Sequence, residues 1–115
     1  GQGRRARCGA FVTFRRTLPN RRPLETFDFD LDGTRYTASA GFFETGGLAE
    51  LFLRAGKPGS AVEVASHDAA VVVSLALQFG TPLNAIRKAL TKLPDGAAAG
   101  PLGRALDMIE ALNAG

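Results

Sequence analysis

The sequence predicts an α+β domain, in which an antiparallel β-meander of three to four strands is followed by two to three helices packed on one face. Two patterns carry this prediction. From Glu25 the apolar residues recur at every second position, and after Ser60 they recur with a helical period of about 3.6. The 115 residues are 45% hydrophobic and 22% charged, which is the composition of one ordinary folded domain.

The first two strands are predicted to form a hairpin. Phe27, Phe29 and Leu31 alternate with polar residues, as in a strand with one buried face. Asp32 and Gly33 then predict a type I′ turn, because both residues tolerate a positive φ. This turn fixes the register, and the expected cross-strand pairs are Leu31–Thr34, Asp30–Arg35, Phe29–Tyr36, Asp28–Thr37 and Phe27–Ala38.

A third strand is expected over Leu48–Arg54, a strongly apolar segment that follows a turn at Glu44–Gly47. Thr13–Leu18 is a candidate for a fourth strand. A sheet of this size has two edges, and Arg35 and Arg54 are the main charged residues that would guard them against pairing. Such edges favour a homo-oligomer.

A long helix is predicted to begin after Ser60, because Ser60 and Glu63 have the spacing of a capping box. Gly80 predicts its end at Gln78 or Phe79, since glycine is favoured just past a helix C-terminus. We expect this helix to be central and buried on most of its circumference, with no enclosed pocket for bond-making chemistry. Its few polar residues are Glu63, Ser66, His67, Asp68, Ser74 and Gln78.

Two further helices are predicted after Gly80. Thr81 is expected to cap the second helix, with Pro82 at its first helical position. Its apolar face would consist of Leu83, Ile86, Leu90 and Leu93, and its outer face would carry Arg87, Lys88 and Lys92. Residues 94–101 are expected to form a loop, and Leu102–Leu112 a third helix.

The net charge of +3 is unevenly divided. Residues 23–115 hold seven basic and eleven acidic residues, whereas residues 1–22 hold no acid and seven arginines: Arg4, Arg5, Arg7, Arg15, Arg16, Arg21 and Arg22. We expect residues 1–17 to form a basic arm on a single domain at 18–115, with 94–115 as its C-terminal extension. The arm favours an anionic partner, either nucleic acid or an acidic protein surface, although a solvated tail is the simpler interpretation.

The single cysteine, Cys8, excludes an internal disulfide, a CxxC redox pair and a cysteine-based zinc site. One cysteine fits a reducing compartment, so the cytoplasm is the expected location. The longest apolar run, Ala69–Leu77, has nine residues interrupted by Ser74, whereas a membrane-spanning helix needs about 20. No membrane span is therefore expected.

Side chains suited to catalysis are few. His67 is the only histidine, and it lies on a polar stripe of the long helix formed by Glu63, His67, Ser74 and Gln78. No triad is expected, because residues along one helix face do not place a base between a nucleophile and an acid. We interpret the stripe as the solvated edge of the helix or as a contact with another subunit. No catalytic or cofactor-binding residue is predicted.

Metal binding is not expected either. One histidine and one distant cysteine do not make a zinc site. Three aspartates alternate along the first strand and therefore project from one face: Asp28, Asp30 and Asp32. We interpret them as a polar surface, because hard cations usually take their ligands from a loop.

An anion site is one interpretation of the glycine-containing turn before the long helix. The candidate anion-binding residues are Arg54, Lys57, Gly59 and Ser60. Basic side chains could hold a phosphate against the free N–H groups of the first helical turn. The spacing is not that of a nucleotide P-loop, and a simple capped turn explains the same residues.

Four segments occur in a characteristic order: LPNRR at 18–22, GLAELFL at 47–53, KPGS at 57–60 and SLALQFGTPL at 74–83. Together they resemble the TSCPD domain, the small module at the C-terminal end of adenosylcobalamin-dependent (class II) ribonucleotide reductases, which also occurs as short stand-alone proteins. The resemblance covers roughly residues 18–93.

The resemblance implies kinship with an accessory domain and not reductase activity. The full reductases use a large barrel, several active-site cysteines and a bound cobalamin, whereas this chain has one cysteine. We therefore expect a non-catalytic accessory or binding module without a cofactor, whose partner is a reductase or another enzyme of DNA precursor supply. The alternatives are a nucleic-acid-binding protein that uses the arginine-rich arm with Arg87, Lys88 and Lys92, and a small enzyme that uses His67.

Overall fold

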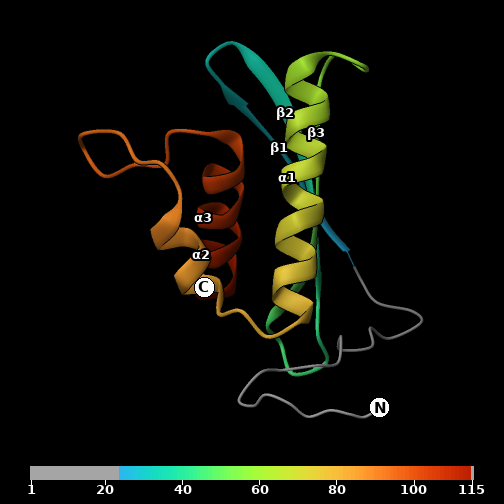
Figure 1. Ribbon diagram of the computed structural model, residues 1–115, viewed down its shortest axis with the longest axis vertical. Helices are drawn as coiled ribbons and strands as arrows, with labels where there is room; N and C mark the ends of the chain where they lie inside the picture. Colours follow the sequence, from blue (N-terminus) through green and yellow to red (C-terminus); the bar gives the residue numbers. More distant parts are fainter. Residues whose placement is uncertain (1–23, 115) are drawn as a thin grey trace, which may run out of the picture.

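The computed structural model describes residues 24–114, which form a three-stranded antiparallel sheet followed by three helices (Figure 1). The strands lie in the order β1 (Leu24–Leu31), β2 (Thr34–Phe42) and β3 (Leu48–Ala55). The helices are α1 (Ala61–Gln78), α2 (Leu83–Ala89) and α3 (Pro101–Ala114). The predicted α+β fold is confirmed. The candidate strand Thr13–Leu18 and the basic arm lie outside the described residues.

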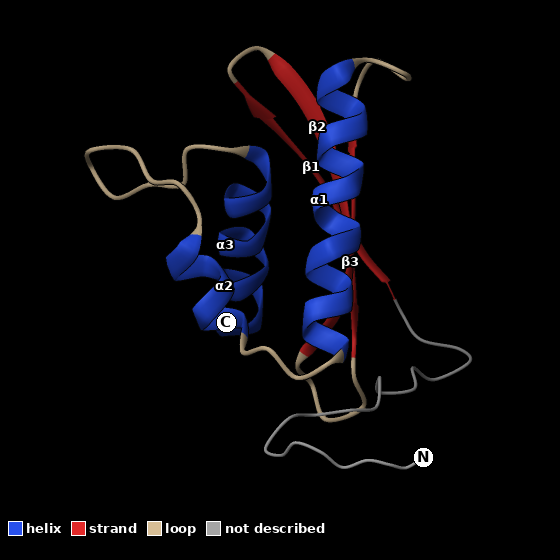
Figure 2. Cartoon of the chain, in the orientation of Figure 1, coloured by secondary structure: helices blue, strands red, loops and turns tan. Residues whose placement is uncertain are grey.

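All three helices lie on one face of the sheet, with α1 along β3, α3 beside α1, and α2 on the outer side of α3 (Figure 2). Alternate residues of each strand point to this face, so the core forms between the sheet and the helices. Its largest fully buried apolar side chains are Leu51, Leu53, Leu106 and Ile109. The opposite face of the sheet carries polar side chains that pair across the strands, such as Thr37 with Asp28 at 2.7 Å.

The β1–β2 hairpin has the register that the sequence predicts. All five expected pairs occur, because the turn has the required geometry: Asp32 and Gly33 have φ angles of 52° and 80°. Phe29 and Tyr36 stack at 5.3 Å between ring centroids on the buried face. The Phe29–Tyr36 and Asp30–Arg35 pairs are each worth roughly 0.2–1 kcal/mol and, together with the turn, favour this register.

The two ends of α1 lie where the sequence predicts, but only one half of the predicted capping box forms, since the N–H of Ser60 donates to the carbonyl of Lys57 and not to Glu63. Ser60 Oγ accepts a hydrogen bond from the N–H of Glu63 at 3.2 Å, and the Glu63 carboxylate accepts one from the N–H of Gly59. At the other end Gly80 has a φ of 104°, and its N–H donates to the carbonyl of Leu77 at 3.1 Å. This is the Schellman arrangement, which needs a left-handed residue just after the helix.

The expectation that α1 is buried on most of its circumference is wrong. The residues that contact the core are Ser66, Ala70, Val73, Leu77 and Gln78, whereas Val72 is 64% exposed and Val64 is 48% exposed. The physical reason is the number of layers: one sheet face and α3 cover a single side of α1, and no further layer lies on the other side of it within residues 24–114. Among residues 24–114, only α1 is long and apolar enough to cross a bilayer, with a mean hydropathy of 1.2. This finding concerns its length and composition alone.

The second helix differs from its prediction. Thr81 does not cap α2, because it is held at the end of α1, where its N–H donates to the carbonyl of Ala76. Pro82 occupies the cap position of α2 and makes no side-chain hydrogen bond there. The helix ends at Ala89, since Leu90 has an extended backbone with ψ at 156°. The third helix is confirmed, beginning one residue earlier than expected and continuing to Ala114.

Candidate interaction surface

Two side chains of α1 close the outer edge of β3. Ser74 Oγ accepts a hydrogen bond from the N–H of Leu51 at 2.8 Å and lies 3.1 Å from the carbonyl oxygen of the same residue. Gln78 Nε2 donates to the carbonyl of Ala49 at 3.0 Å. These backbone groups are on the side of β3 that β2 does not use, so α1 takes the place of a fourth strand there.

This arrangement corrects the interpretation of the polar stripe. Ser74 and Gln78 are not a solvated edge or a subunit contact, because they bond to the β3 backbone and Gln78 is only 1% exposed. Sequence periodicity missed this role, since it depends on which strand edge lies beside the helix. The closure also leaves β1 as the sheet edge without such a cover in the described part of the chain.

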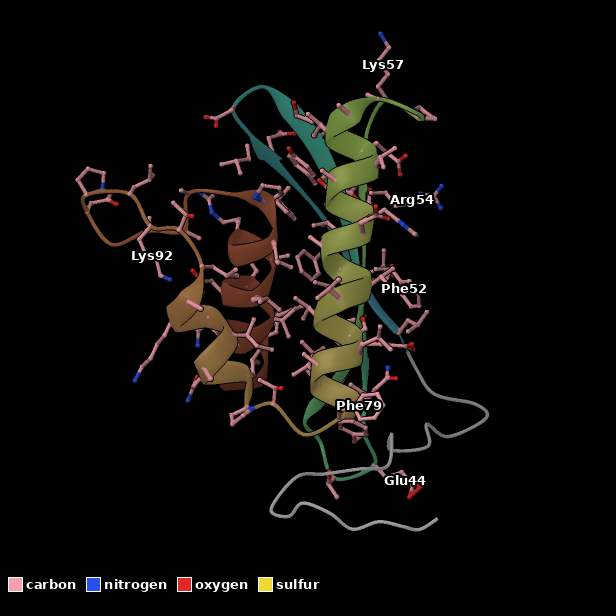
Figure 3. The ribbon with its side chains drawn as sticks, in the orientation of Figure 1. Glu44, Phe52, Arg54, Lys57, Phe79 and Lys92 are labelled. Atoms are coloured by element: carbon pink, nitrogen blue, oxygen red, sulfur yellow. The ribbon has the colours of Figure 1, made fainter. Side chains whose placement is uncertain are left out.

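The other side of α1 is exposed and mostly apolar, with the charged side chain of Asp68 among the apolar residues. We define the α1 outer face as Val64, Val71, Val72, Leu75 and the capping Phe79, whose exposed fractions lie between 39% and 64%. Phe79 projects on the side of α1 away from α3 (Figure 3). Phe52 on β3 is also 45% exposed, but it pairs with Ser39 on the face of the sheet opposite to the helices and is not part of this surface. Single exposed apolar residues are ordinary, but several along one helix face mark an interaction surface.

His67 lies next to this surface without a catalytic partner. Its Nδ1 is 3.4 Å from Oδ1 of Asp68, and the two side chains are 54% and 72% exposed. Ser74, the hydroxyl on the same stripe, is bonded to the β3 backbone instead. The structure therefore brings together an exposed histidine and an acid, but it does not add a nucleophile to them among residues 24–114.

The structure places the four candidate anion-binding residues around the start of α1. Lys57 projects beyond the end of the helix, whereas Arg54 projects sideways from β3, so the two basic groups point in different directions (Figure 3). Ser60 Oγ donates to the carbonyl of Lys57 at 2.8 Å, and the carboxylate of Glu63 lies against the N–H of Gly59. The capping interactions use the same groups, and the carboxylate opposes a bound anion. The anion site stays a prediction.

The basic residues of α2 and the following loop make internal contacts. Arg87 Nε lies 3.0 Å from Oδ1 of Asp107 in α3, and Lys92 Nζ donates to the carbonyls of Leu90 and Arg87 near the end of α2. Of the predicted second nucleic-acid patch, Lys88 and Lys92 are exposed and Arg87 is partly buried. The seven arginines at positions 4–22 lie outside the described residues.

The three aspartates of the first hairpin do not form a cation site in the described structure. Asp30 lies 3.5 Å from Nε of Arg35, and Asp28 accepts a hydrogen bond from Thr37. Within residues 24–114 no group of three histidine, cysteine, aspartate or glutamate side chains is placed to hold a metal ion. Two of the three aspartates thus contact side chains of β2, and the polar surface stays a prediction.

Comparison with known proteins relates the chain to part of a large enzyme. It is 34% identical over 77 residues to a vitamin B12-dependent ribonucleotide reductase of Agrobacterium fabrum, a match that covers 67% of this chain and 6% of that protein. Reductases of the same name from Streptantibioticus cattleyicolor and Streptomyces clavuligerus are 35% identical over 69 residues, or 60% of this chain and 12% and 7% of theirs.

The matches thus span only 6–12% of the length of these curated relatives. No family model matches it, and no solved structure matches it. The sequence matches are nevertheless consistent in identity and extent across three organisms. The chain is related to one segment of the vitamin B12-dependent ribonucleotide reductases.

Proposed function

We propose that this chain is a TSCPD-like accessory module that binds a reductase or another enzyme of deoxyribonucleotide supply and does no chemistry itself. The α1 outer face is the surface that docks on the partner. The observation that carries the proposal is the exposure of Val71, Val72 and Leu75 along one helix, at 41%, 64% and 39%. Apolar surface of this kind gains free energy when a partner removes it from water.

The relation to the reductases supports this choice of partner. In those proteins the matching segment is a small part of one long chain, so it has the rest of the enzyme beside it. A face that packs on the rest of a large protein is apolar in the way that the α1 outer face is apolar. A related module would use the same face to bind a reductase that is a separate chain.

The side chains of this chain support a module that does not catalyse a reaction. Reductase chemistry requires several thiols in defined positions, and the chain has one cysteine. Ser74 is held by Leu51 through both backbone groups, and His67 pairs with a neighbouring exposed acid. These contacts give Ser74 a structural role and leave His67 without a substrate pocket in the described structure.

The test is binding of the purified full chain to a vitamin B12-dependent ribonucleotide reductase from the same source, measured by isothermal titration calorimetry. We expect micromolar binding that Leu75→Asp weakens by about tenfold or more, because a buried unpaired carboxylate costs more than 1.4 kcal/mol. Leu112→Asp is the matched control, since Leu112 is a 55% exposed leucine on α3 and lies on another surface. It should leave the affinity within about twofold.

Two results would contradict the proposal. One is no measurable binding by the native chain, and the other is an equal loss of affinity in Leu75→Asp and Leu112→Asp. A parallel titration with fluorescent DNA at about 50 mM salt examines the nucleic-acid alternative, whose affinity should fall steeply with added salt. Tight DNA binding that Leu75→Asp does not change, without reductase binding, would replace the present proposal.

A further inference from the structure

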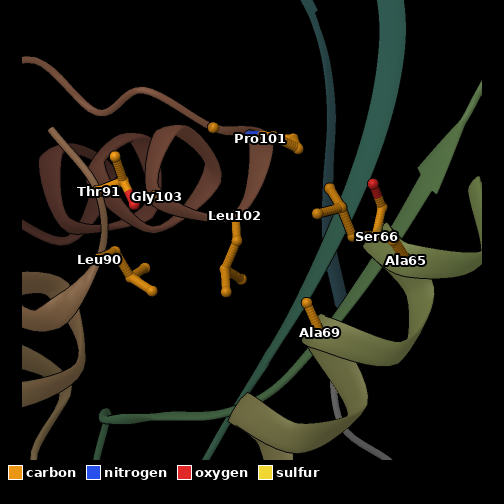
Figure 4. Close-up of a pocket in the computed structure, with 10 residues that line it drawn as sticks. Ala65, Ser66, Ala69, Leu90, Thr91, Pro101, Leu102 and Gly103 are labelled. Atoms are coloured by element: carbon orange, nitrogen blue, oxygen red, sulfur yellow. The ribbon is translucent and has the colours of Figure 1, made fainter. Parts of the chain in front are cut away.

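A cavity of about 230 Å³ lies between α1 and the segment that leads from α2 into α3 (Figure 4). Ala65, Ser66 and Ala69 line it on the α1 side, and Leu90 and Leu102 line it on the opposite side. The lining is mostly apolar, and none of the residues that form it carries a charge.

The cavity has an identifiable structural cause. Beside the cavity, α1 presents the small side chains of Ala65, Ser66 and Ala69, which do not fill the space between α1 and the start of α3. The start of α3 is held by its own loop: a Cβ on Gly103 would lie 3.0 Å from the Cβ of Ala98, which is 2% exposed. The start of α3 therefore packs closely against its own loop, and space remains between this part of α3 and α1.

One polar group in the wall of the cavity has no hydrogen-bond partner among residues 24–114. Ser66 is 5% exposed, and its hydroxyl makes no hydrogen bond with any residue of the described chain. Ser74, two turns later on the same helix, has its hydroxyl against the backbone of Leu51. Buried hydroxyls are normally paired, because losing water without gaining a partner costs free energy. A serine hydroxyl can both donate and accept, and it rotates among three χ1 positions.

We propose that this cavity binds a small uncharged aromatic molecule of one or two rings that carries a single hydrogen-bonding group. The ring packs against Leu90, Leu102 and Ala69, and the polar atom pairs with the hydroxyl of Ser66. The size fits, because an apolar cavity of about 150 Å³ in another protein holds benzene. The site is separate from the α1 outer face and does not depend on the proposed function.

The lining also excludes other ligand classes. A phosphate or carboxylate would be desolvated without a basic partner, since no charged side chain lines the cavity. A nucleobase carries several polar edge atoms, whereas the lining side chains offer only the hydroxyls of Ser66 and Thr91. The cavity therefore selects against nucleotides, even though the relatives of this chain are ribonucleotide reductases.

The test is an NMR titration of the full ¹⁵N-labelled chain with three probes: phenol, toluene and benzoate. We expect saturable shifts of the amides of residues 65–69 and 100–103 with phenol, weaker shifts with toluene, and none with benzoate. Ser66→Ala should weaken phenol binding by about fivefold, the effect of one lost hydrogen bond, and leave toluene binding unchanged.

Ala69→Leu should abolish the shifts with all probes, because its side chain fills the cavity. Ala61→Leu is the matched control, since Ala61 is exposed on the same helix and does not line the cavity. The thermal midpoint of each variant verifies that it is folded, and a second filling variant, Ser66→Leu, replaces Ala69→Leu if that one does not fold.

The proposal fails if neither phenol nor toluene produces saturable shifts in these amides. It also fails if the shifts persist in a folded filling variant, or if Ser66→Ala weakens phenol and toluene binding equally. Leu75→Asp should leave phenol binding intact, so that failure of the reductase contact and failure of this site are separate results.

Discussion

Ser74 shows how a single side chain can close the edge of a sheet. Its hydroxyl lies within hydrogen-bonding distance of both the N–H and the carbonyl of Leu51, and it also lies 2.9 Å from the carbonyl of Ala70. Without this hydroxyl, two polar groups of β3 would face an apolar helix. The Ser74 hydroxyl therefore takes the place that the backbone of a further strand would have beside β3.

This role predicts a loss of stability in Ser74→Ala. Removing the hydroxyl leaves Leu51 unpaired, so we expect the free energy of unfolding to fall by about 1–3 kcal/mol in urea denaturation. Ser39→Ala is the control, because the Ser39 hydroxyl makes only an exposed bond to Thr26. That change should stay within about 0.5 kcal/mol. Equal stability of Ser74→Ala and the native chain would contradict this role.

The same residue marks a limit of sequence reasoning. Ser74 and His67 both fall on one polar stripe of a predicted helix, and nothing in the pattern separates them. Their different roles depend on the position of β3, which lies beside Ser74 and leaves His67 in solvent. The hairpin pairs could be predicted because the turn residues that fix them are adjacent in the sequence.

At the scale of elements, the sequence predicts where α1 begins and ends but not which of its faces are buried. Its capping box and glycine stop act over a few residues, so the sequence specifies them locally. The burial of α1 depends on how many other helices and sheets pack against it, and in residues 24–114 these are the sheet and α3. An apolar helix with one covered face has a surface available for a partner.

Replacing Gly80, the residue that ends α1, is predicted to lower the stability of the protein. Its φ of 104° is costly for a residue with a side chain, so Gly80→Ala should lower the free energy of unfolding by about 1–2 kcal/mol. Gly47→Ala is the matched control, because Gly47 is exposed and the added Cβ would meet its nearest atom, in Phe43, at 3.9 Å. Urea denaturation of both variants measures the difference. Similar losses in both would rule out a special role for the end of α1.

At the scale of the whole molecule, the sheet has unequal edges. Ser74 and Gln78 cover part of the β3 edge, whereas among residues 24–114 β1 pairs with β2 alone. The β1 segment and its turn carry four acidic residues and no basic residue: Glu25, Asp28, Asp30 and Asp32. If the predicted homo-oligomer forms through a sheet edge, we expect it to pair at β1, where two copies would place like charges together.

We expect this self-association to be weak in dilute salt and stronger in concentrated salt. Raising NaCl from about 0.1 M to about 1 M shortens the screening length from about 10 Å to about 3 Å, so light scattering should detect more dimer. Asp28→Asn should raise the dimer fraction at low salt, because it removes a charge and keeps an acceptor for Thr37. Asp95→Asn, on the loop before α3, is the control. A monomer under every condition would contradict pairing at β1.

The sequence by itself determined the strands, the hairpin register, the ends of α1 and the presence of three helices, because turns, caps and periodicity act between residues close in the chain. It also carried the resemblance to the reductase module, which the comparisons support at the level of a related segment. Only the tertiary structure decided which face of α1 is covered, which sheet edge is closed, and where space remains beside Ser66. Those properties depend on contacts between residues far apart in the sequence, and an apolar pattern is the same whether its neighbour belongs to this chain or to another.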